Sequence, residues 1–270
     1  MEQNMKRTYL STLLLLIVLA ACSAQTVIRN GKNLEERFPT PENFERVKTD
    51  ENSFAYFLRH YPLKPYGSPV LLYNGEKKWS NVHESVFDMP ILSTDLIQCA
   101  DAVIKLRAEY LYSQKRYDEI HFNLTNGMTV PFSRFANGER VSVSGNQTKW
   151  VDGGKKGYDR SVFEEYLKFI YTYAGTLSLS KEARAKDIKD IEPGDFFIRG
   201  GSPGHVVLVL DVAQDKRTGK KIMLLGQSYM PSQEFHLLKS FEKISPWYYV
   251  EDATLRTPEW TFQKGSLMGF

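Results

Sequence analysis

The sequence predicts an α+β fold, in which helices and short hairpins come first and an antiparallel sheet follows. Two segments, 95–115 and 163–173, are predicted to be amphipathic helices because their apolar residues recur every three or four positions. Two apolar runs, 194–211 and 222–228, are joined by a charged turn, which is typical of an antiparallel hairpin. We therefore expect the first long helix to pack against a sheet built around these two runs.

The composition excludes several function classes. The chain has 270 residues, of which 42% are hydrophobic and 25% are charged, as in ordinary globular proteins. A net charge of +3 is too small to indicate a nucleic-acid partner. The two cysteines and five histidines show no metal-ligand spacing, and no phosphate or dinucleotide loop is present. We expect neither a metal nor an organic cofactor.

The N-terminus predicts export. Lys6 and Arg7 precede the apolar run 13–19, and small residues lead to Cys22, which is the pattern of a secretion signal. Leu19-Ala20-Ala21-Cys22 also resembles a bacterial lipobox. The resemblance implies cleavage before Cys22 and its lipidation, so that the lipid bilayer of the cell envelope becomes a partner. The alternative is an ordinary signal peptide that is cleaved nearby.

Three regions follow from this interpretation. Residues 1–21 are the signal peptide, 22–52 are the lipidated cysteine with a polar tether and entry segment, and 53–270 form one α+β domain. The domain is expected to begin with a short helix, 54–59, which is stopped by the prolines that follow.

The remaining elements are predicted in chain order. A strand at 70–73 ends in an Asn-Gly turn, with 83–89 as its partner. The long helix begins at the cap Ser93-Thr94-Asp95. The later segments are a strand at 120–124, a hairpin turning at 145–146, the helix 163–173, an irregular stretch 176–193, the sheet strands, and a strand within 234–238.

The stretch 194–211 contains a candidate general base. His205 opens a buried strand, and the glycines before it allow the backbone to approach closely. An imidazole held at the mouth of a strand is suited to proton transfer. Pairing the two sheet strands across the charged turn places His205 opposite residues 228–230, so that Gln227 and Ser228 lie within reach of its ring. Cys99 on the long helix is the one thiol left once Cys22 is lipidated.

These residues resemble a known enzyme group. Gly194-Asp195-Phe196-Phe197, followed by Gly204-His205-Val206-Val207-Leu208-Val209, resembles the histidine region of papain-like NlpC and CHAP cell-wall peptidases and amidases. The resemblance implies a papain-like fold with Cys99 as nucleophile, His205 as base and Gln227 as its orienting residue. It implies hydrolysis of amide bonds in cell-wall stem peptides, with Gln98 or nearby backbone N–H groups stabilising the oxyanion.

The secreted chain over most of residues 45–265, particularly the segment from Gln98 to Tyr112, also resembles an uncharacterised bacterial lipoprotein family, which carries no established activity. The sequence departs from the enzymes at Gln98, where they usually have Asp or Asn. A cap at Thr94 would place Cys99 beyond the first helical turn, where the helix dipole lowers a thiol pKa less effectively.

Alternative roles accompany each candidate residue. Cys99 shares a helical stripe with Val103 and Leu106 and could be a packing residue. Arg107 is a candidate for binding a substrate carboxylate. The chain could accordingly be a non-catalytic ligand-binding lipoprotein that keeps the papain-like fold, or a scaffold in an envelope complex.

Overall fold

A large antiparallel sheet forms one end of the molecule. The computed structural model describes residues 26–270, so that Cys22 and the predicted signal peptide lie outside the described residues. The strands of the sheet are β1 (Phe44–Arg46), β2 (His83–Val86), β7 (Arg184–Ala185), β8 (Phe196–Arg199), β9 (His205–Asp215), β10 (Lys221–Gln227), β11 (His236–Leu238), β12 (Tyr248–Tyr249) and β15 (Leu267–Gly269). They run in the order β2-β11-β10-β9-β8-β15-β7, with β1 beside β9 and β12 beside β10.

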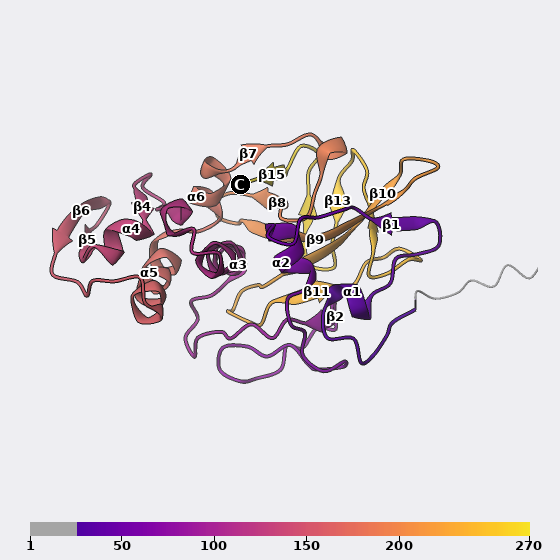
Figure 1. Cartoon of the computed structure of the whole chain (residues 1–270), viewed down its shortest axis with the longest axis horizontal. Coiled ribbons are helices and arrows are strands. Elements are labelled where there is room, and N and C mark those ends of the chain that lie inside the picture. The colour runs from indigo at the N-terminus through magenta and orange to yellow at the C-terminus, as the bar shows by residue number, and fades with distance from the viewer. Residues whose placement is uncertain (1–25) are drawn as a thin grey trace, which may run out of the picture.

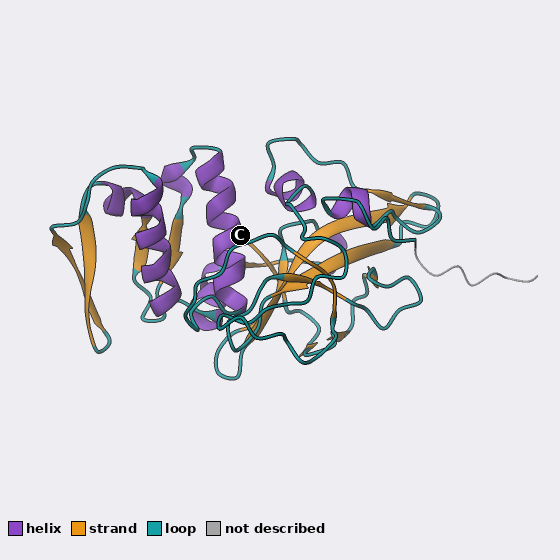
Figure 2. Ribbon diagram, turned by 90° about the horizontal axis from the view of Figure 1, so that it is seen from below, coloured by secondary structure: helices purple, strands orange, loops and turns teal. Residues whose placement is uncertain are grey.

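Helices and two small hairpins from residues 99–182 form the other end, whereas the helices before residue 60 and the hairpin after residue 254 lie at the sheet (Figures 1 and 2). The helical elements are α1 (Leu34–Arg37), α2 (Phe54–Arg59), α3 (Cys99–Ser113), η1 (Tyr117–Glu119), α4 (Phe132–Ala136), α5 (Arg160–Tyr173), α6 (Thr176–Glu182) and η2 (Ile188–Asp190). The hairpins are β3 (His121–Asn123) with β4 (Thr129–Pro131), β5 (Glu139–Ser144) with β6 (Gln147–Asp152), and β13 (Leu255–Arg256) with β14 (Thr261–Phe262). Helix α3 stands between the two ends and packs on β9. The structure confirms the predicted α+β class with its antiparallel sheet.

Strand β9 is buried on both faces. Val206, Leu208 and Leu210 belong to the core that includes α3, whereas Val207 and Val209 belong to a second core shared with Phe262 of β14. Alternate residues of a strand point to opposite faces. The unbroken apolar run therefore reflects cover on both sides, as its composition predicts.

The long helix begins later than its sequence predicts. It begins at Cys99 rather than near Ser93, and the backbone N–H of Gln98 donates to Oδ2 of Asp101 at 3.0 Å. Asp95, the expected first-turn acid, accepts instead from the backbone N–H of Ser232 at 2.6 Å. A long-range contact thus removes Asp95 from the helix and places Cys99 at its first position.

Other helices and hairpins agree more closely with the sequence. Helix α2 and the β5–β6 hairpin form where they are predicted. Helix α5 begins three residues before 163 because the side chain of Asp159 accepts from the backbone N–H groups of Ser161 and Val162 and caps it. Such caps satisfy donors that a helix start leaves unpaired.

Two local predictions are wrong. Strand β2 does not pair with 70–73 but with β11, while Leu72 forms a bridge with Gln233. The stretch 176–193, expected to be irregular, contains α6, β7 and η2. Strands β2 and β7 pair with β11 and β15, which lie far along the chain, so that local sequence patterns carry no information about these pairings.

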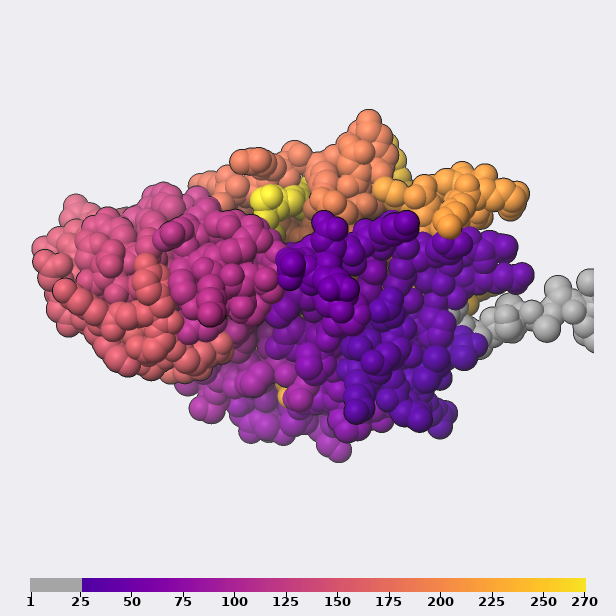
Figure 3. Space-filling view, viewed as in Figure 1, coloured from indigo at the N-terminus to yellow at the C-terminus, as the bar shows by residue number. Residues whose placement is uncertain are grey.

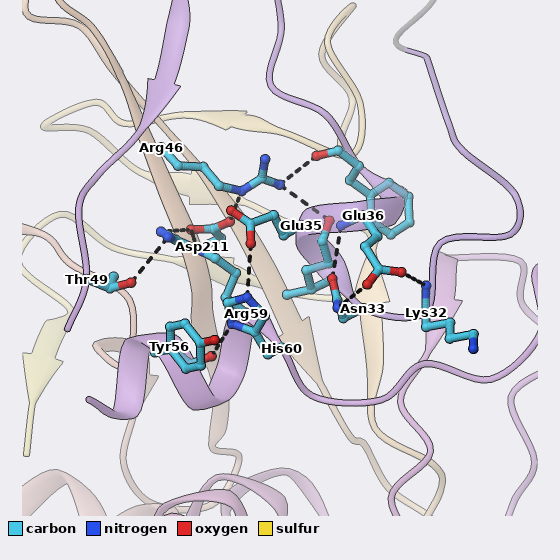
Figure 4. Close-up of polar contacts among 12 residues, drawn as sticks. Lys32, Asn33, Glu35, Glu36, Arg46, Thr49, Tyr56, Arg59, His60 and Asp211 are labelled. Atoms are coloured by element: carbon cyan, nitrogen blue, oxygen red, sulfur yellow. Dashed lines mark hydrogen bonds and ion pairs between the residues drawn. The ribbon is translucent and has the colours of Figure 1, made fainter. Parts of the chain in front are cut away.

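Residues 26–52, the described part of the predicted tether and entry segment, contribute to the packed domain. Strand β1 pairs with β9, and Phe38 is fully buried in the core. Arg46 and Arg59 both bind the buried carboxylate of Asp211 on β9, at 2.6 and 2.7 Å (Figure 4). The space-filling view shows this N-terminal segment, in indigo, spread over one face of the molecule (Figure 3).

Candidate active site

The Cys99 side chain lies at the first turn of α3, where the backbone N–H groups of a helix have no intrahelical partner. The residue is only 7% exposed, and this burial raises the pKa of the thiol to about 11. The nearby Asp101 carboxylate raises this pKa further, whereas the backbone N–H groups of Ala100 and Val206 stabilise the thiolate and oppose the rise. Val206 directly follows His205, so that the thiol lies at the start of β9.

The His205 ring is held by the next strand. Its Nε2 lies 2.8 Å from Oε1 of Gln227, the last residue of β10. The pairing of β10 with β9 ends with Gly226 opposite Leu208, which agrees with the register expected from the sequence. Burial lowers the pKa of His205 to about 4, so that the imidazole is neutral at physiological pH.

Ser228, the other polar residue expected near His205, points elsewhere. Its hydroxyl donates to the carbonyl of Gln233 at 2.7 Å. The His205 ring packs instead against Tyr229 and Trp260, with ring centroids 4.7 and 5.3 Å away.

Cys99 and His205 line the same cleft, which has a volume of about 700 Å³. The loop before β9 forms one wall of this cleft together with the start of α6. A Cβ atom at Gly204 would lie 2.3 Å from Oγ1 of Thr176, and one at Gly200 would lie 2.1 Å from Oγ of Ser180. Both distances are shorter than any real contact, so these two glycines allow the close approach that shapes the wall.

The cleft also contains buried polar groups that no protein group satisfies. Among the described residues, Oδ1 of Asp101, the Tyr171 hydroxyl and Nε1 of Trp260 have no hydrogen-bond partner, and all three residues line the cleft. Burial raises the pKa of the Asp101 carboxyl to about 7. Buried polar groups without partners are costly, and strongly perturbed pKa values gather at functional sites.

The structure places Gln98, predicted to stabilise the oxyanion, and Arg107, predicted to bind a substrate carboxylate, differently with respect to the cleft. Gln98 lines the cleft, but its side-chain Nε2 donates to Oδ1 of Asp95 at 3.0 Å. The backbone N–H groups of the first turn are therefore better placed than this side chain to stabilise an oxyanion. Arg107 is outside the cleft: its guanidinium lies over the rings of Phe54 and Phe270, about 5 Å from each centroid.

Three residues near His205 carry no signal in the sequence. Glu259 accepts from Nε2 of Gln227 at 2.6 Å and from Lys78 at 2.8 Å, and Trp260 covers the His205 ring. All three lie in loop segments without periodicity, and only the folded chain brings them to β9. The signal for Asp101 is its place as an acid in the first turn of α3, which follows only from a helix start at Cys99.

Two further features concern the described part of the chain. Within residues 26–270, no cluster of three or more His, Cys, Asp or Glu side chains is placed to hold a metal ion. No helix in that range combines the length and the apolar character needed to cross a bilayer.

Comparison with known proteins gives one match. Residues 34–269 match a family described as a domain of unknown function (4846). Neither the curated proteins nor the solved structures contain a significant match to the chain.

Proposed function

The chain belongs to the domain of unknown function 4846 family, and we propose that it is a thiol-dependent hydrolase of amide or peptide bonds with a papain-like site. The observation that carries the proposal is one cleft lined by a thiol at a helix N-terminus and by an imidazole that the next strand orients. A nucleophile, a base and a group that orients the base are the three parts that such chemistry requires.

The reaction starts from a neutral pair. Because burial raises the pKa of Cys99 and lowers that of His205, the thiol and the imidazole are both uncharged before substrate binds. Nδ1 of His205 takes the thiol proton as Sγ attacks the substrate carbonyl carbon, and backbone N–H groups at the start of α3 stabilise the oxyanion. The C–N bond breaks as His205 returns the proton to the leaving amine.

The second half of the reaction releases the product. The acyl group is then bound to Cys99 as a thioester. His205 deprotonates a water molecule, which attacks the thioester carbon and releases a carboxylic acid and the free thiol. The cycle consumes one water and needs no redox partner.

We place the enzyme at the bacterial envelope, anchored in the lipid bilayer through an acylated Cys22, with cell-wall stem peptides as substrates. The support is the lipobox-like sequence before Cys22 and the resemblance of the segment around His205 to cell-wall peptidases. The unpartnered donor of Trp260 and the hydroxyl of Tyr171 suit the amide groups of an extended peptide.

The test is the alkylation rate of Cys99 by iodoacetamide, measured against pH for the native protein and for His205→Ala. If His205 acts as base, we expect the alkylation rate of the variant at neutral pH to be lower by at least about 10-fold, since general bases contribute 10²–10⁴-fold. Gln263→Ala, a change at an exposed position in the C-terminal segment, serves as the matched control. Equal rates in the native protein and in His205→Ala would contradict the proposed pair.

A non-catalytic ligand-binding lipoprotein is the second candidate, and one observation favours it. The thiol is 7% exposed and its pKa is raised to about 11, as expected of a packing cysteine. In that case Cys99 reacts with iodoacetamide only after denaturation, and Cys99→Ala binds cell-wall fragments as tightly as the native chain.

A further inference from the structure

A chain of hydrogen bonds continues beyond Gln227 and ends on charged groups. Nε2 of Gln227 donates to Oε2 of Glu259 at 2.6 Å. The other carboxylate oxygen of Glu259 accepts from Lys78 at 2.8 Å and from Ser80 at 3.2 Å. The Gln227 side chain is fully buried, and the side chains of Lys78 and Glu259 are 6% and 16% exposed, so that water competes little for these bonds.

The direction of these hydrogen bonds, from donor to acceptor, fixes the orientation of the Gln227 amide. A carboxylate only accepts hydrogen bonds, so the Gln227 group that faces Glu259 must be its NH₂. The amide oxygen then faces His205, and Nε2 of His205 must carry a proton to donate to it. In a neutral imidazole, a proton on Nε2 leaves Nδ1 as the unprotonated acceptor.

We propose that Glu259 is a positioning residue that sets the tautomer of His205 through Gln227, with Lys78 and Ser80 holding its carboxylate in place. The inference rests on the proposed function, because it matters for catalysis only if His205 accepts the thiol proton. Glu259 touches neither reacting atom, and it acts by keeping Nδ1 of His205 free to receive that proton.

The substitution Glu259→Gln is expected to reverse the direction of the hydrogen bonds that link position 259, Gln227 and His205. Lys78 only donates, so the new amide turns its oxygen toward Lys78 and its NH₂ toward Gln227. Gln227 must then turn its oxygen to position 259 and its NH₂ to His205. Nε2 of His205 becomes the acceptor, the ring proton moves to Nδ1, and the base is lost without any change in side-chain volume.

A double substitution distinguishes this role from a merely structural one. Adding Gln227→Glu to Glu259→Gln places an acceptor-only group beside His205 again and a donor-capable amide at 259. His205 then donates to position 227 and Lys78 donates to position 259, as in the native chain, and only the bond between 227 and 259 runs the other way, from the amide at 259 to the carboxylate at 227. We expect the Nε2-protonated tautomer to return in the double variant, which no general loss of packing would explain.

The test is the ¹⁵N NMR spectrum of the histidine side chains in the full chain purified in detergent. His205 is assigned by loss of its signals in His205→Asn. His236 provides an internal reference, because its Nδ1 lies 2.9 Å from the carbonyl oxygen of Glu234 and must be protonated. The matched control is Glu251→Gln, at an exposed glutamate in the same C-terminal segment.

The expected results are a proton on Nε2 of His205 in the native chain and in Glu251→Gln, and on Nδ1 in Glu259→Gln. Alkylation of Cys99 at neutral pH should fall about 10-fold in Glu259→Gln, as for loss of a general base. An unchanged His205 tautomer in Glu259→Gln would overturn the inference. A tautomer that switches while alkylation stays equal in the native chain and in His205→Ala would instead uphold the positioning role and refute the proposed catalytic pair.

Discussion

Asp101 makes a quantitative prediction about stability near the candidate nucleophile. Asp101 is 6% exposed, its Oδ2 accepts from the backbone N–H of Gln98, and its Oδ1 has no partner among the described residues. Burial raises its pKa from 3.8 to about 7. Since one pKa unit corresponds to 1.36 kcal/mol, folding with Asp101 ionised costs about 4 kcal/mol more than with Asp101 protonated.

The sign of the pH dependence follows from linkage. An acid whose pKa is higher in the folded state stabilises the fold fully below its unfolded pKa, near 4. That contribution is lost as the pH rises to about 7, and it does not change further above that value. His205 has a lowered pKa of about 4 and acts in the opposite direction over part of this range.

The variant Asp101→Asn isolates the contribution of Asp101. The asparagine keeps an oxygen that can accept from Gln98 N–H but never ionises. We expect the unfolding free energy of the variant minus that of the native chain to increase by about 4 kcal/mol between pH 4 and pH 8. Urea unfolding curves at several pH values measure this difference.

The same substitution should change the reactivity of the thiol. The Asp101 carboxylate raises the pKa of Cys99, so Asp101→Asn should speed alkylation of Cys99 at pH 8. A free-energy difference that stays constant from pH 4 to pH 8 would refute the reasoning, because it would mean that Asp101 ionises normally in the folded chain.

Four further substitutions test the fold and the extent of the site. Asp211→Asn should destabilise the chain by about 3–5 kcal/mol in urea unfolding, because it leaves the buried Arg59 and the partly buried Arg46 without their carboxylate; Glu45→Gln, in an exposed ion pair, should cost under about 1 kcal/mol. Gly204→Ala should lower the unfolding free energy by about 1–3 kcal/mol by overpacking the cleft wall. An unchanged unfolding midpoint would show that the wall accommodates the methyl group without loss of stability. Arg107→Ala should leave the alkylation rate of Cys99 unchanged, since Arg107 lies outside the cleft. A slower rate in this variant would show that Arg107 contributes to the site.

The sequence predicts the sheet and the position of His205 well, for a physical reason. The run from Val206 to Leu210 is apolar at every position, and the charged turn after it sets the register of β9 and β10 to within the one-residue shift between Leu224 and Leu225. Register places Gln227 beside His205 without any knowledge of the rest of the fold. Local patterning is sufficient where both partners are joined by a short turn.

Long-range contacts explain what the sequence does not predict. The start of α3 depends on Asp95, which binds the backbone of Ser232 more than a hundred residues away. Glu259 reaches Gln227 from a loop near the C-terminus, and Lys78 reaches Glu259 from a loop near the N-terminus. Nothing in the local sequence of these residues indicates their partners.

Cleavage of cell-wall fragments tests the central claim most directly. The native protein, Cys99→Ala and His205→Ala are each incubated with purified peptidoglycan fragments, and mass spectrometry identifies any new amine and carboxyl termini. The account predicts cleavage of an amide bond by the native protein, none by Cys99→Ala, and at least about 10²-fold less by His205→Ala. Fragments that bind equally to the native protein and to Cys99→Ala, and remain intact with both, would contradict it and identify a binding protein.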